Sequence, residues 1–130
     1  MNVDGSESDQ NAEPLVSREE LARLYGPIAD ELGEELIDQF RGDSMGYSKT
    51  LARLAGDLVH DPTAARAEIA YVAHTIKGSA AALGALGLTQ AALDVETIAK
   101  TATTETVQEA ISALDALLVK FHDLQFSALP

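Results

Sequence analysis

Three residues in one alanine-rich stretch have types and a spacing that could support a reaction: His74, Lys77 and Gly78. Neutral imidazole is nucleophilic near physiological pH. On a helix with about 100° per residue, the apolar residues of this stretch gather on one side, and His74 lies roughly 140° from the centre of that side. Lys77 falls at its boundary. The sequence therefore predicts a helix that presents His74 to solvent, where a reacting group can approach it.

Small side chains surround His74 on the predicted exposed face. Ala67, Ala70, Gly78 and Ala81 all lie on this side of the helix, whereas a solvated helix face normally carries charged or long polar residues. Glycine inside a helix costs about 1 kcal/mol relative to alanine, and an outward glycine gains nothing from core packing. We interpret Gly78 as clearance for a bulky partner that approaches the imidazole.

Helical patterns that can position this stretch run from residue 15 to the end of the chain. Ser17 followed by Glu20 is a capping box, which predicts the start of a short helix. The two glycines of residues 84–87 end the helix that carries His74. The predicted helices cover residues 17–25, 27–40, 62–83 and 88–102. One further helix follows a loop at 42–44 and ends near 59, and Thr103 or Thr104 is expected to cap a last helix.

The apolar stripes of these helices predict how they pack. Short connections between amphipathic helices imply antiparallel neighbours, and no stretch shows the alternation of a strand. We therefore predict an all-α fold, an antiparallel up-down four-helix bundle with an additional short N-terminal helix or helices. It would occupy residues 15–130, after a disordered acidic tail at residues 1–14. The second helix is predicted to bury Ile28, Leu32, Leu36 and Phe40, and the last helix Val107, Ile111, Leu114, Leu118 and Phe121.

Composition argues against several classes of protein. The formal net charge is -12, from 21 acidic and 9 basic residues, so a nucleic acid would be repelled. With no cysteine, neither a disulfide nor a thiolate metal site is expected. No segment approaches about 18 uninterrupted apolar residues, so no membrane span is predicted. The first 14 residues do not resemble a secretory signal. We expect a cytoplasmic monomer.

A family resemblance follows from four positions. His74, Lys77, Gly78 and Gly84 match the pattern H-x-x-K-G-x-x-x-x-x-G. This pattern resembles that of histidine phosphotransfer domains, both free-standing ones and those of chemotaxis kinases. The helical spacing resembles theirs from about residue 27 to residue 126.

The resemblance implies a role for each residue. His74 would accept a phosphoryl group, on Nε2, from the aspartyl phosphate of a receiver domain or from a histidine kinase, and donate it to another receiver aspartate. Lys77 would offset charge on the phosphoryl oxygens, and Gly78 would leave room for the partner. The receiver would supply Mg²⁺, so the chain would need no metal or cofactor of its own. The partner would dock over Ala67, Ala70, Tyr71 and Ala81.

Glu96 is a further candidate, on the predicted helix that follows. The segment from Leu93 to Glu96 resembles one in chemotaxis-type domains, where a glutamate can hold the Nδ1–H of the histidine and so select its tautomer. Other members of the family place a polar residue elsewhere on that helix, at a position that Ala99 would occupy here.

Alternative functions stay open at this stage. The chain could dock a receiver without carrying phosphate, or could be the phosphotransfer fragment of a chemotaxis-type kinase. A complete kinase would need a nucleotide-binding domain, for which there is no room. His60 falls at a helix C-terminus, where a histidine interacts well with the dipole and needs no function, and His122 is interpreted as structural because it flanks the core stripe of the last helix. A metal site in a bundle would need convergent ligands such as Glu-x-x-His pairs, which the three scattered histidines do not supply.

Overall fold

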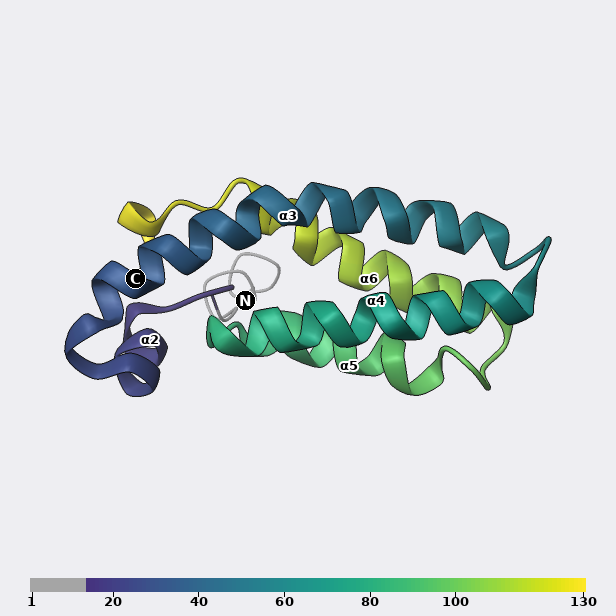
Figure 1. Cartoon of the computed structure of the whole chain (residues 1–130), viewed down its shortest axis with the longest axis horizontal. Helices are drawn as coiled ribbons and strands as arrows, with labels where there is room; N and C mark the ends of the chain where they lie inside the picture. Colours follow the sequence, from purple (N-terminus) through teal and green to yellow (C-terminus); the bar gives the residue numbers. More distant parts are fainter. Residues whose placement is uncertain (1–13) are drawn as a thin grey trace, which may run out of the picture.

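Four long helices lie side by side in the computed structural model, which describes residues 14–130 (Figure 1). Helix α3 contacts α4 and α6, and α5 contacts the same two helices, so each packs against two neighbours around a ring. Short connections join consecutive helices, which therefore run antiparallel. The described residues contain no strand, and the predicted four-helix bundle is confirmed. The helices are α3 (Ala29–Asp57), α4 (Pro62–Ala82), α5 (Leu86–Ile98) and α6 (Thr104–His122).

Shorter elements close one end of the bundle. Helix α2 (Arg18–Tyr25) and the 3-10 turn η1 (Gly26–Ile28) precede α3, and the 3-10 turn η2 (Phe126–Ala128) follows α6. The Ser17 hydroxyl accepts the Glu20 N–H at 3.1 Å, as the predicted capping box requires. The Glu20 carboxylate instead pairs with Arg23. Apart from Pro14, the predicted acidic tail (1–14) lies outside the described residues.

The predicted break at residues 42–44 is wrong, because α3 runs without interruption through Gly42, Asp43 and Ser44. Gly42 faces outward, with open space where a Cβ would lie. Ser44 is fully buried, and its hydroxyl donates to the carbonyl of Arg41 at 2.9 Å. Burial of the flanking apolar residues against the other helices outweighs the weak helix propensity of this stretch.

The predicted core face at the start of α3 is wrong in part, because Phe40 is buried as predicted but Leu32 and Leu36 are only partly buried. Ile28 is 57% exposed, whereas Ala29, Gly33 and Ile37 are buried. A Cβ on Gly33 would lie 2.9 Å from Leu21 Cδ1. Leu21 of α2 packs directly over Gly33, so the buried face of this part of α3 is turned by about one residue from the predicted stripe and runs through Ala29, Gly33 and Ile37.

Gly84 determines how α4 ends. Its φ of 66° is left-handed, a conformation that glycine adopts without strain. The Gly84 N–H donates to the carbonyl of Ala81 at 3.0 Å, and the Ala85 N–H donates to Ala80 at 3.0 Å, which is the Schellman arrangement. The chain turns at once, so α5 begins at Leu86 and not at residue 88 as predicted. The helix also ends earlier than predicted, at residue 98 instead of 102.

The last helix follows the prediction. Thr103 caps α6 by accepting the N–H of Thr106 at 3.2 Å. The predicted stripe of α6 is buried in full: Val107, Ile111, Leu114, Leu118 and Phe121.

Within residues 14–130, no helix is long and apolar enough to cross a membrane.

Candidate functional site

His74 lies on the outer face of α4, and its side chain is 66% exposed. The opposite face of the helix is closed, because Ala73, Ile76 and Ala80 are fully buried. The apolar residues at helical spacing therefore hold one side of α4 in the core and turn His74 outward. The predicted exposure of the imidazole agrees with this placement.

Glu96 of α5 joins His74 and Lys77 into one cluster. Glu96 Oε2 lies 2.8 Å from His74 Nδ1, and Glu96 Oε1 accepts a hydrogen bond from Lys77 Nζ at 2.7 Å. Glu96 and Lys77 are 26% and 29% exposed, so both are partly sheltered by the α4–α5 contact. Val95, beside Glu96, is fully buried and fixes the face that α5 turns toward α4.

The electrostatics of the cluster favour an ionised Glu96. Its pKa is lowered, first by the hydrogen bond from Lys77, then by the contact with His74, while partial burial works in the opposite direction. An ionised carboxylate at Nδ1 favours the tautomer with its proton on Nδ1. The lone pair is then on Nε2, which makes no hydrogen bond within the described residues.

The face around His74 carries small side chains, as predicted. A Cβ added to Gly78 would meet no atom within 4 Å, so the glycine is not required by packing. Ala67 and Ala81 are exposed and Ala70 is partly buried. Tyr71, three residues before His74 on the same helix, is the exception: its large side chain is 72% exposed.

Other residues singled out in the sequence lie elsewhere. His60 follows the end of α3 and His122 ends α6, and both are exposed. Ala99, the alternative position for a polar residue near the histidine, is fully buried just after α5. In residues 14–130 no group of three His, Cys, Asp or Glu side chains is placed to hold a metal ion.

Lys77 is already hydrogen-bonded, which was not expected from the sequence. Its ammonium group was predicted to face the incoming phosphoryl group, whereas it is paired with Glu96 in the structure. The available signal was the position of Lys77 at the edge of the core face, which turns its side chain toward a neighbouring helix.

The fold and this cluster define a class: a helical bundle that presents one oriented histidine on its surface. The family model of the Hpt domain matches residues 35–123, more than half of the chain. The chain therefore belongs to the histidine phosphotransfer (Hpt) domain family, as its motif predicted. Members of this family carry phosphoryl groups in two-component signalling, interact with receiver domains and kinases, and have no kinase activity of their own. No curated protein and no solved structure matched the chain.

Proposed function

We propose that this chain is a phosphorelay intermediate in which His74 accepts a phosphoryl group from a receiver aspartyl phosphate, or from a kinase, and passes it to another receiver aspartate. The observation that carries the proposal is the exposed imidazole whose Nδ1 is held by Glu96 at 2.8 Å. This contact leaves Nε2 as the free nucleophilic atom.

The transfer needs little from the chain beyond this geometry. The Nε2 lone pair attacks phosphorus, an N–P bond forms, and the P–O bond to the donor aspartate breaks, which releases the aspartate as a carboxylate. The proton on Nδ1 stays shared with Glu96, which stabilises the positive charge that the ring gains. Because phosphoryl transfer depends mainly on positioning and charge stabilisation, Mg²⁺ bound to the receiver would supply most of the remaining catalysis.

Lys77 and Gly78 act around this step. The Lys77 ammonium lies within reach of a phosphoryl group on His74 because the two residues are about one turn apart on the helix. Its hydrogen bond to Glu96 fixes the position of the ammonium group and offsets part of its positive charge. Gly78 leaves the approach open, and the receiver would rest on Ala67, Ala70, Tyr71 and Ala81.

A phosphotransfer profile tests the proposal. Each receiver domain of the source organism is phosphorylated with ³²P and mixed with the chain. We expect acid-labile label to move to the parent chain from at least one receiver and to be absent from His74→Gln.

His60→Gln and His122→Gln are the matched controls and should take label like the parent. Label on His74→Gln would assign the acceptor to another residue. Binding of a receiver with no transfer to the parent would favour the alternative function, a docking adaptor.

A further inference from the structure

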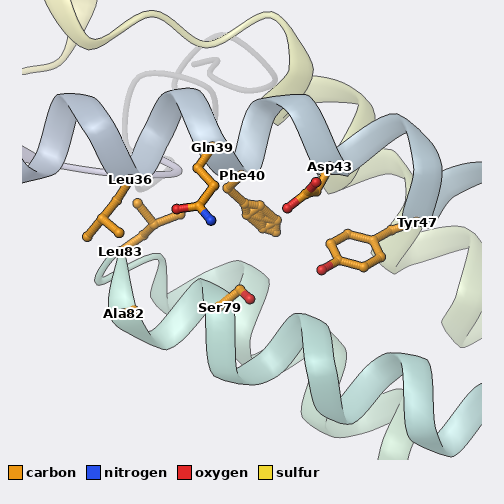
Figure 2. Close-up of a pocket in the computed structure, with 8 residues that line it drawn as sticks. All are labelled: Leu36, Gln39, Phe40, Asp43, Tyr47, Ser79, Ala82 and Leu83. Carbon is orange, nitrogen blue, oxygen red and sulfur yellow. The ribbon is translucent and has the colours of Figure 1, made fainter.

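A cavity of about 140 Å³ lies between the middle of α3 and the end of α4 (Figure 2). It is a separate feature from the His74 cluster. A cavity of about 150 Å³ is large enough to hold a benzene-sized group. Leu36, Phe40 and Leu83 form its apolar wall, and Gln39, Asp43, Tyr47 and Ser79 carry the polar groups around it.

The charge of the cavity comes from Asp43 alone. Within residues 14–130 this carboxylate forms no ion pair, whereas Asp38, one turn and a half earlier on α3, is paired with Arg41 at 2.9 Å. The pKa of the Tyr47 hydroxyl is raised, first by burial of its side chain and then by the Asp43 carboxylate, while the interaction with Ser79 lowers it. The phenol therefore stays neutral, and the lining has a net negative charge.

These groups suit a cation that ends an aliphatic chain. A carboxylate, an amide oxygen and hydroxyl oxygens accept hydrogen bonds from an ammonium or guanidinium group. The apolar wall matches the methylene stem that lysine and arginine lay along apolar surface while the charged end stays near water. The opening to solvent allows a side chain to enter from outside.

The cavity borders the face that carries His74. Ser79 lies roughly 140° around α4 from His74, on the side that faces α3, whereas Ala82 of the lining lies only about 80° around the helix from His74 and about 12 Å along it. A protein interface of standard size covers about 800 Å² on each partner. A receiver centred on His74 therefore reaches the edge of the cavity without moving from the imidazole.

We propose that this cavity receives one lysine or arginine side chain of the receiver domain that docks over His74. The proposal rests on the proposed function, and it assigns to Asp43 a part in choosing the partner. The charge of -12 on the whole chain attracts a receiver with a basic patch, and the cavity offers one defined place for a single basic residue of that patch.

The test compares Asp43→Asn with Glu35→Gln, which also removes one negative charge from an exposed position of α3. Glu35 is not among the lining residues, and it lies about 100° around the helix from Leu36, so its side chain points away from the cavity. Transfer to each variant is measured from the receiver that reacts fastest in the profile. Labelling of His74 by phosphoramidate, a small donor that needs no docking, is measured in parallel.

We expect Asp43→Asn to lower kcat/KM with the receiver by roughly fivefold to tenfold through KM. Glu35→Gln should change it by less than about twofold. Both variants should take label from phosphoramidate at the parent rate and melt at the parent temperature. The lysines and arginines of the receiver are then replaced by alanine, one at a time. One of these replacements should lower kcat/KM with the parent chain but cause no further loss with Asp43→Asn.

Equal kcat/KM for the two variants would overturn the cavity proposal and leave the proposed function intact. An effect of Asp43→Asn without any coupled basic residue would also overturn it, because the carboxylate would then act only by long-range attraction. Failure of the parent chain to take phosphate from any receiver, with normal labelling by phosphoramidate, would instead count against the proposed function.

Discussion

At the scale of single residues, the proposed chemistry depends on one carboxylate with two partners. Glu96 contacts Nδ1 of His74 with one oxygen and Nζ of Lys77 with the other. It therefore orients the imidazole and positions the ammonium at the same time. An exposed histidine by itself would populate both tautomers and several ring orientations, so the pairing turns a surface residue into a defined nucleophile.

Replacing Glu96 by glutamine should separate orientation from folding. The amide keeps the size of the side chain but loses the charge that favours the Nδ1–H tautomer. We expect phosphoryl uptake from a receiver to slow by roughly tenfold, the lower end of the loss that follows removal of the hydrogen-bond partner of a metal-binding histidine. ¹⁵N NMR of the imidazole should show a larger share of the Nε2–H tautomer.

Asp94→Asn, on the same helix and away from His74, is the control and should behave like the parent. If Glu96→Gln slowed uptake without changing the tautomer, Glu96 would act through Lys77 and not through the ring.

Gly78→Gln should raise stability and lower function. Glycine is about 1 kcal/mol less favourable than alanine inside a helix, and glutamine recovers about half of that or more. Nothing within 4 Å opposes a Cβ at this position. The melting temperature should therefore rise by about 2–4 °C, while transfer from a receiver slows strongly because a long side chain stands one turn from the imidazole.

Gly78→Ala adds only a methyl group. It should melt higher as well and keep most of its transfer rate. A lower melting temperature for both variants would contradict the assignment of Gly78 to clearance and indicate that packing requires the glycine.

At the scale of the elements, α4 has two faces with different tasks. One face packs into the bundle with Ile69, Ala73, Ile76 and Ala80, all fully buried. The other carries His74 and small residues that leave the surface flat. The short turn through Gly84 then brings α5 back along α4, and this return places Glu96 opposite His74.

Ala81→Glu should weaken docking without weakening the fold. Ala81 is exposed on the His74 face, and a charged side chain there would have to lose its water beneath an apolar partner. We expect KM for a receiver to rise several-fold, with kcat and the melting temperature close to those of the parent. Steady-state transfer kinetics and thermal unfolding measure the two effects.

Ala113→Glu makes the same change on an exposed position of α6, the helix diagonally opposite α4 in the bundle. It should leave both quantities unchanged. Equal effects of the two substitutions would place the docking face elsewhere on the bundle.

At the scale of the whole molecule, the excess of acidic residues affects both the stability of the fold and the rate at which the chain associates with a receiver. Because the net charge is -12 on 130 residues, the acidic side chains repel one another in the folded state. The ion pairs among the described residues are mostly exposed, such as those of Arg53 with Asp57 and Glu68. Exposed pairs contribute about 0–1 kcal/mol each, so they offset the repulsion only in part.

Salt should therefore stabilise the fold and slow the encounter with a receiver. Raising NaCl from about 20 mM to about 200 mM shortens the screening length from roughly 20 Å to below 10 Å. We expect the melting temperature to rise and the association rate with a basic receiver to fall over this range. Calorimetry and stopped-flow mixing measure the two responses. A falling melting temperature would mean that the ion pairs outweigh the repulsion.

Local sequence patterns were sufficient for much of this protein. The four positions from His74 to Gly84 predicted the family, and the spacing of Ile69, Ala73 and Ile76 predicted that His74 faces solvent. Helix periodicity is a property of consecutive residues, so it can be read without knowledge of the partner elements. The same holds for the stripe of α6 and for its cap, which the sequence placed at Thr103 or Thr104 and the structure places at Thr103.

Only the tertiary structure decided how the helices meet. Whether Glu96 or another position on α5 reaches His74 depends on the turn at Gly84 and on the register of α5 against α4. The sequence alone left this open. The loop predicted at 42–44 and the stripe predicted to begin at Ile28 were wrong, because burial against distant residues outweighed local propensity. The packing of α2 over Gly33 had no signal in the local sequence. The cavity beside Asp43 exists for the same reason, since its two walls belong to helices that only packing brings together.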